Sequence, residues 1–197
     1  MVDKAPVLHA GSLRMEPLRE RHLDDLWPMF RDSRDALLPY MFWAHTQTDR
    51  ESQLAFIRNS ERARDEEREQ VFLVFAGDVA VATLGLHQLA SPHRGAELGF
   101  WVHTAHTGRG ICTAIAARST RYAFDELGLH RLFIRHGLDN HASRAVIHKL
   151  GFVHEGTARD DLWVGDRFVS HEYYAMLEDD FTSARERLLA LETSARI

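Results

Sequence analysis

The spacing of apolar and polar positions along this 197-residue chain predicts strands and helices in alternation. Apolar residues at every second position indicate strands, and apolar residues three or four apart indicate amphipathic helices. The short pairs Gly77-Asp78 and Gly165-Asp166 each separate two apolar runs and therefore predict hairpin turns. Strands are expected at 13–18, 71–76, 79–86, 97–102, 131–136, 160–164 and 168–177, and helices at 22–34, 47–68, 110–127, 142–150 and 179–197.

This order of elements predicts an α/β (α+β) fold with a mixed, mostly antiparallel sheet and helices on both faces. Strands 97–102 and 131–136 bracket a helix and are expected to form one parallel pair. The sequence contains no internal repeat and no low-complexity linker. We therefore expect residues 1–197 to form a single domain.

Composition narrows the class of protein. Hydrophobic residues make up 45% of the chain, and the formal net charge of −5 argues against a nucleic-acid binder. A single cysteine excludes an internal disulfide, and no apolar run is long enough to span a membrane. The 13 histidines are scattered without the spacing of a zinc site, so no metal is expected. These features indicate a cytoplasmic protein.

A glycine-rich turn follows the strand at 97–102 and leads directly into a helix. The turn reads Gly108-Arg109-Gly110. Amide groups at a helix start lack partners inside the helix, and the helix dipole adds partial positive charge there, so the site suits a phosphate or diphosphate. The turn is neither a nucleotide-hydrolase loop, which needs Lys-Ser or Lys-Thr after the last glycine, nor a dinucleotide fingerprint, since Thr113 stands at the third glycine position.

Two further motifs follow this turn. Asn140 and Ser143 form Asn-x-x-Ser at the start of a helix, and Gly151-Phe152 follows the end of that helix. Together with the turn, these motifs resemble the GNAT acyltransferase superfamily, in particular its Rim-type branch of ribosomal-protein N-terminal acetyltransferases. The turn matches the family pattern at both glycines and departs from it at Ala105, where Gln or Arg is commoner. The resemblance covers roughly residues 10–178.

The resemblance implies a fold, a cosubstrate and a reaction. In this family the two parallel strands splay apart and admit the pantetheine arm of acetyl-CoA, the acyl-donor cosubstrate. An amine then attacks the thioester directly in a ternary complex, which makes the chain an N-acetyltransferase. The implied acceptor is a primary amine, and first among these a protein N-terminal α-amine, as on a ribosomal protein. Relatives of this type pair as homodimers.

Alternatives remain open at this point. The motifs are also consistent with a small-molecule or antibiotic amine as the acceptor, and with succinyl-CoA as the acyl donor. Two alternatives belong to other functional classes. One is a non-catalytic CoA-binding module, and the other is a phosphate-binding enzyme of another fold.

The resemblance also assigns roles to residues that hold the cosubstrate. A backbone N–H at Trp101 or Val102 is expected to bind the carbonyl oxygen as it becomes an oxyanion, at a strand bulge that Gly99 would allow. Asn140 is expected to cap its helix and to offer its amide to pantetheine, whereas Ser143 lies near the sulfur. The full set expected to bind CoA is Trp101, Val102, Thr107, Gly108, Arg109, Gly110, Ile111, Cys112 and Asn140.

The remaining catalytic roles are a base and an acceptor pocket. Asp161 is the preferred base and Glu97 the second choice, with Ser143 as the proton source for the thiolate. An α-amine has a pKa of about 7.7–8.0, against about 10.4 for lysine, so a weak or water-mediated base suffices. Cys112 at a helix start is a rival nucleophile, although a small core residue is the favoured interpretation. Aromatic side chains of one loop are expected to line the acceptor pocket, namely Tyr40, Phe42 and Trp43.

Overall fold

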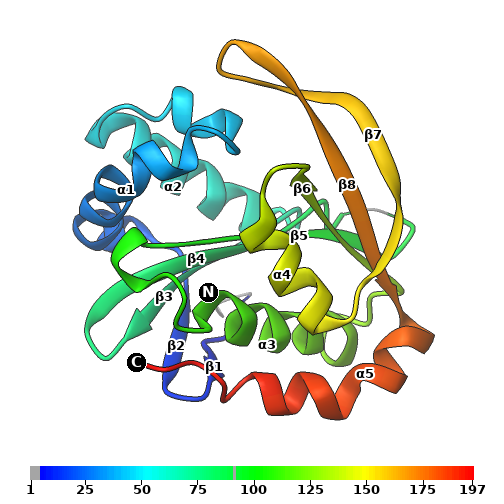
Figure 1. Ribbon diagram of the computed structural model, residues 1–197. Coiled ribbons are helices and arrows are strands. Elements are labelled where there is room, and N and C mark those ends of the chain that lie inside the picture. The colour runs from blue at the N-terminus through cyan, green and yellow to red at the C-terminus, as the bar shows by residue number, and fades with distance from the viewer. Residues whose placement is uncertain (1–4, 91) are drawn as a thin grey trace.

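The computed structural model describes residues 5–90 and 92–197, and its framework is one eight-stranded sheet (Figure 1). The strands lie in the order β1-β2-β3-β4-β5-β6-β8-β7, and every neighbouring pair is antiparallel except β5 and β6. This arrangement confirms the mixed, mostly antiparallel sheet. The strands are β1 (Leu8–Ala10), β2 (Leu13–Pro17), β3 (Gln70–Ala76), β4 (Val79–His87), β5 (Gly95–Val102), β6 (Arg131–Gly137), β7 (Val153–Val164) and β8 (Arg167–Leu177).

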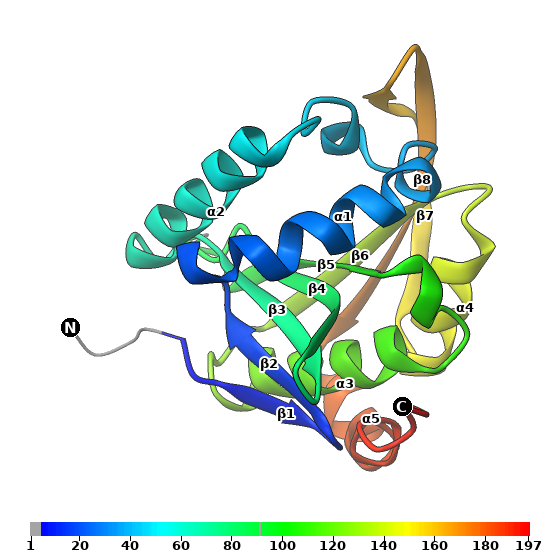
Figure 2. The same ribbon diagram turned by 90° about the vertical axis from the view of Figure 1, so that its left-hand side faces the viewer.

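Helices cover both faces of this sheet, as expected (Figure 2). Two of them lie on one face, and three lie on the other: α1 (Leu23–Leu37) and α2 (Arg50–Asp65) on the first, and α3 (Ile111–Asp125), α4 (His141–Leu150) and α5 (Glu178–Leu191) on the second. Short 3₁₀ turns occupy Glu20–His22, Phe42–His45 and Thr104–His106. Within the described ranges, no helix has the length and apolar character that crossing a bilayer requires.

The parallel pair is very short. Strands β5 and β6 pair only from Gly95 with Arg131 to Glu97 with Phe133. Beyond these residues β5 continues to Val102 and β6 to Gly137 without further pairing between the two strands. The expected splay is therefore present, and it begins directly after Glu97.

The main differences from the expectations concern β1, β7 and α5, and α2 is also shorter than expected at both ends. Strand β1 was not predicted, because its three residues are too few to show a period. Strand β7 begins at Val153 instead of 160, and its register shifts between Ala158 and Leu162 break the alternation that a sequence pattern needs. The terminal helix α5 ends at Leu191, so the prediction of helix to residue 197 is wrong for the last residues.

The bulge expected in β5 is absent. The register between β4 and β5 runs without interruption from His87 opposite Glu97 to Ala82 opposite Val102. The irregularity lies one strand away, where the pairing of β3 with β4 shifts between Val74 and Phe75. Gly99 instead stands directly opposite Gly85, which leaves two neighbouring strand positions without side chains.

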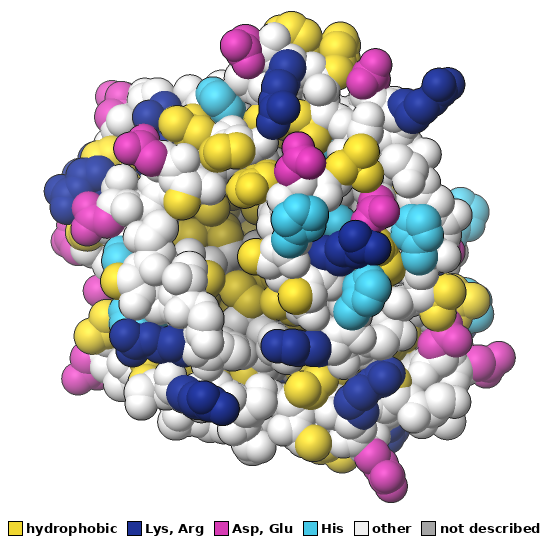
Figure 3. Space-filling model, viewed as in Figure 1, with side chains coloured by type: hydrophobic (Ala, Val, Ile, Leu, Met, Phe, Trp, Pro, Cys, Tyr) yellow, Lys and Arg dark blue, Asp and Glu magenta, His cyan; other side chains and the backbone are white. Residues whose placement is uncertain are grey.

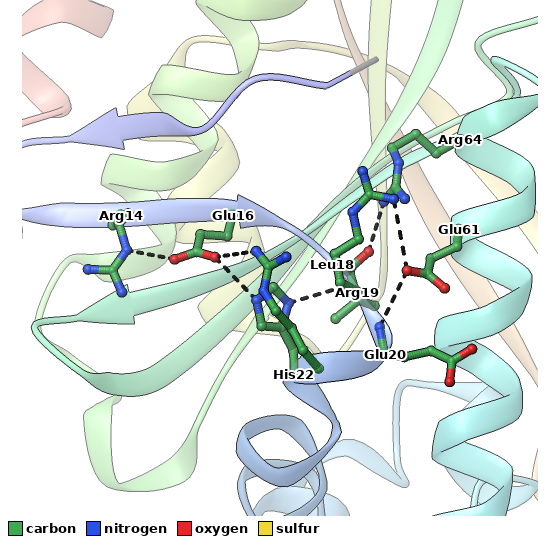
Figure 4. A network of polar contacts seen from close by, with 9 residues as sticks. Arg14, Glu16, Leu18, Arg19, Glu20, His22, Glu61 and Arg64 are labelled. Carbon is green, nitrogen blue, oxygen red and sulfur yellow. Dashed lines mark hydrogen bonds and ion pairs between the residues drawn. The ribbon is translucent and has the colours of Figure 1, made fainter. Parts of the chain in front are cut away.

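A polar network joins β2 and the residues that follow it to α2 and to the start of α1 (Figure 4). The buried Arg64 of α2 donates from Nη1 to the carbonyl of Leu18 at 2.8 Å. His22 accepts from the amide of Arg19 at Nδ1 (3.2 Å), and its Nε2 lies 3.2 Å from Glu16. These contacts hold α2 against the segment after β2, and they hold the residue before α1 against β2. They therefore help to position the helical layer that forms one wall of the candidate site.

Candidate active site

The turn before α3 has the backbone geometry of an anion site. Gly108 and Gly110 have positive φ angles of 74° and 81°, which glycine adopts without strain. Among the described residues, the backbone amides of residues 108–113 donate to no acceptor, and the first bond of the helix runs from Ala114 to the carbonyl of Gly110 at 3.0 Å. A diphosphate fits such a row of free donors, because anions bind at helix starts.

The end of the chain supports this turn from behind. The amide of Arg196 donates to the carbonyl of Arg109 at 2.8 Å. A Cβ on Gly110 would lie 3.1 Å from the carbonyl oxygen of Ser194, so only glycine fits here without moving the chain end. Arg109 itself is exposed, as are Thr107 and Gly108, whereas Ile111 is buried in the core.

A cavity of about 500 Å³ crosses the sheet where β5 and β6 separate. Consecutive residues of one strand point to opposite faces. Since residues 97–101 of β5 and 134–137 of β6 all line this cavity, it passes between the two strands. Figure 3 shows a hollow lined by hydrophobic side chains between the α1–α2 side and α4, with Lys and Arg side chains below it.

Aromatic side chains form the wall on the α1–α2 side. The loop residues Tyr40, Phe42 and Trp43 all line the cavity. The ring of Phe30 lies 5.9 Å from that of Trp43 and 6.3 Å from that of Trp101, distances typical of packed aromatic pairs. The wall of the cavity on the α1–α2 side is therefore largely aromatic at this point.

Helix α4 presents its first turn to the other part of the cavity. The side chain of Asn140 accepts from the amide of Ser143 at 3.1 Å and so caps the helix. Both residues line the cavity, and the partly exposed Ser143 hydroxyl makes no hydrogen bond within the described ranges. That hydroxyl is therefore able to donate to a group bound in the cavity.

The two carboxylates expected to act as base share one partner, Arg135. Its guanidinium donates to Glu97 at 2.8 and 3.4 Å and to Asp161 at 3.4 Å. Burial lowers the pKa of Arg135, but the charge of Glu97 and the hydroxyl of Tyr173 more than offset this, so the pKa is raised. Glu97 lines the cavity, while Asp161 lies behind it on β7 and accepts from Tyr173 at 3.1 Å.

Sequence reasoning did not find three polar residues of this region. Arg135 stands on β6, and His171 lines the cavity with Nδ1 3.2 Å from Asp161. Burial lowers the pKa of His171, which keeps its imidazole neutral near neutral pH. His87, on β4, also lines the cavity. The only signal in the sequence was a polar residue within an apolar strand, which does not distinguish a site from an exposed face.

The remaining expected residues lie apart from the cavity. Val102 packs against the core on the α3 side, and the turn residues 107–112 form the helix start outside the cavity lining. Burial raises the pKa of the Cys112 thiol to about 12, so this cysteine is not the low-pKa nucleophile considered as a rival. The described residues contain no group of three or more His, Cys, Asp or Glu side chains suited to a metal.

Comparison with known proteins decides the family. The sequence profile described as "Acetyltransferase (GNAT) domain" matches residues 12–153. The chain belongs to the GNAT acetyltransferase family. This GNAT protein is 39% identical to the "Putative ribosomal N-acetyltransferase YdaF" of Bacillus subtilis (strain 168) over 50% of its own length and 54% of the relative's. The chain thus spans about half of that curated relative.

Longer matches come at lower identity. The "Ribosomal-protein-serine acetyltransferase" of Escherichia coli (strain K12) is 22% identical over 85% of this GNAT chain and 94% of the relative. The solved structure of Mycobacterium smegmatis RimJ in complex with CoA-disulfide superposes with a TM-score of 0.84 at 25% identity and covers 98% of this chain and 96% of that one. The fold and family expected from the sequence are confirmed.

Proposed function

We propose that the protein is an acyl-CoA-dependent N-acetyltransferase that transfers the acetyl group of acetyl-CoA to a primary amine, with residues 1–197 acting as one domain. One observation carries the proposal. The cavity passes through the gap between β5 and β6, so a donor on the α4 side and an acceptor on the aromatic side meet inside the sheet. Membership of the GNAT family supports the same reaction.

The chain offers two places to hold the acyl donor. The free amides of residues 108–113 suit its diphosphate, and the gap between the strands suits its pantetheine arm. The similar fold of Mycobacterium smegmatis RimJ, solved in complex with CoA-disulfide, supports this placement. Bound there, acetyl-CoA supplies an activated thioester carbonyl.

The reaction removes two protons from an ammonium group. The amine first loses one proton, and its nitrogen then attacks the thioester carbon as the oxygen gains negative charge. The C–N bond forms, the C–S bond breaks, and the thiolate takes a proton while the product amide loses its second. A backbone N–H at Trp101 or Val102 is the proposed donor to the oxyanion, and an amide of this kind is worth roughly 3 kcal/mol.

Ser143 is the proposed proton donor to the departing thiolate. Its hydroxyl lines the cavity and makes no hydrogen bond within the described part of the chain. A thiol has an ordinary pKa near ~8.5, so the thiolate leaves without help at an appreciable rate. We therefore expect Ser143→Ala to lower kcat by about 10- to 100-fold without abolishing transfer.

A protein N-terminal α-amine is the proposed acceptor, as on a ribosomal protein. Support comes from the names of two relatives, which describe a putative ribosomal and a ribosomal-protein-serine acetyltransferase. The apolar wall formed by Phe30, Trp43 and Trp101 also suits a small amine that carries an apolar group. A cytoplasmic location and a homodimer are further proposals that rest on the sequence resemblance.

Incubation with acetyl-CoA or succinyl-CoA and a panel of amines tests the function. The panel holds N-terminal peptides, lysine peptides, polyamines and aminoglycosides, and free thiol is followed over time. Transfer to α-amine peptides above all others is the expected result. Binding of CoA without transfer to any amine would favour a non-catalytic CoA-binding module instead.

A further inference from the structure

An imidazole and a carboxylate form a pair on the acceptor side of the cavity. Nδ1 of His87 lies 3.3 Å from Oε2 of Glu69, and both residues line the cavity. The contact with His87 lowers the pKa of Glu69, which keeps that carboxylate ionised. A carboxylate that accepts from Nδ1–H fixes the neutral tautomer in which Nε2 carries the lone pair.

The other ring nitrogen lies against the backbone of Gly85. A Cβ on Gly85 would lie 2.4 Å from Nε2 of His87, and one on Gly99 would lie 3.8 Å away. The two glycines stand opposite each other on β4 and β5, so their missing side chains leave a depression in which the ring lies. Within the described part of the chain, Nε2 has no hydrogen-bond partner, and His87 lines the cavity.

This nitrogen is close to the point where the strands separate. His87 stands opposite Glu97, the last residue of β5 that pairs with β6. Both carboxylates expected from the sequence to act as base are held by Arg135, whereas Nε2 of His87 is unengaged. A base must lie within reach of the proton it removes. The imidazole is favoured as base because Nε2 has no partner, whereas both carboxylates are already paired with Arg135.

On the basis of the proposed acetyl transfer, we propose that His87 is the catalytic base and Glu69 its positioning residue. Nε2 takes one proton from the acceptor ammonium, and the neutral nitrogen attacks the thioester carbon. The imidazolium later releases that proton to solvent. The second proton of the ammonium group goes to the departing thiolate when the amide forms, so protons and charge balance.

Three variants test this assignment in steady-state assays with acetyl-CoA and the best amine of the panel. His87→Gln is expected to lower kcat by about 100-fold. The same variant should bind CoA within twofold of the wild-type affinity. His87→Ala should regain activity when free imidazole is added, which a merely structural role does not allow. Glu69→Gln should lower kcat by about tenfold, since the amide oxygen still accepts from Nδ1–H but carries no charge.

The pH profile separates a base from a packing residue. The charged groups that face the imidazole are Glu69 and, from β5, Glu97. Glu97 is already paired with Arg135 on β6, and the charge of Arg68 helps to lower the pKa of Glu69. The wild-type protein should show an acid limb in kcat/KM, because a protonated imidazole cannot accept a proton from the amine. In His87→Gln the limb should disappear.

A matched control comes from another imidazole–carboxylate pair. Nδ1 of His130 lies 3.5 Å from Glu178, outside the cavity, so His130→Gln should leave kcat unchanged. If His87→Gln retains wild-type kcat, or imidazole fails to rescue a folded His87→Ala, the assignment is wrong even though transfer continues. If the wild-type protein transfers no acyl group, the proposed function itself fails. Should the His87 variants not fold, the kcat of a folded Glu69→Gln variant decides, and a wild-type value contradicts the assignment.

Discussion

Replacing Gly110 by alanine tests the support that the chain end gives to the anion turn. An L-residue in the left-handed region costs about 1–2 kcal/mol, and Gly110 has a φ of 81°. The new Cβ would also lie 3.1 Å from the carbonyl oxygen of Ser194, so the chain end must move to make room for it. A loss of 1 kcal/mol lowers Tm by roughly 2–4 °C in a chain of this size. Gly110→Ala should therefore lower Tm by more than about 4 °C.

Gly108→Ala is the matched control. Its φ is 74°, but no atom lies within 4 Å of the position of its Cβ, so it carries the backbone strain without the contact. Thermal unfolding followed by circular dichroism measures both variants, in the full chain and in a chain that ends at Thr193. The excess loss in Gly110→Ala should vanish in the shortened chain. Equal losses for both alanine variants in the full chain would refute the reasoning.

Three other properties follow from the contacts described above. Arg135→Leu should lower the free energy of unfolding by about 2 kcal/mol, as measured in urea, because it removes the cation that two partly buried carboxylates share. Cys112 should resist iodoacetamide at pH 8 in the folded protein and react after unfolding, since its thiol pKa is raised to about 12. The free energy of unfolding should fall as pH drops below about 6.5, because burial lowers the pKa of His22 and His171 and the unfolded chain takes up protons first.

Each of these outcomes has its own check. An Arg131→Leu variant removes a more exposed pair, Arg131 with Glu155, and should cost less than Arg135→Leu. Rapid alkylation of the folded thiol would contradict the raised pKa of Cys112. The pH effect should be smaller in a His22→Gln, His171→Gln double variant, and an unchanged slope between pH 6.5 and 5.5 would assign it to other groups.

The sequence was informative where structure is local. Glycines at 108 and 110 and the cap at Asn140 follow from short-range chemistry, and the structure shows the positive φ angles and the capping bond. Apolar periodicity gave the longer helices and most strands for the same reason. It missed β1, which has three residues, and misjudged β7, whose pattern is interrupted by a shift of register.

The part that could not be predicted depends on contacts between distant segments. Arg135 pairs with carboxylates from β5 and β7, and His87 pairs with Glu69, the residue before β3. These partners are far apart in the sequence, so no regular spacing predicts the pairs. Gly99 illustrates the limit well. Its presence indicated a bulge, but its role depends on Gly85 opposite, which only the register reveals.

The short pairing of β5 with β6 divides the sheet into two leaves, β1–β5 and β6–β8–β7, joined along a seam of three residue pairs. A molecule inserted between the leaves contacts both and adds to the few interactions across the seam. Occupancy should therefore slow amide hydrogen exchange most in the strand residues that border the gap. The two leaves would then be coupled mechanically through the bound molecule as much as through the polypeptide.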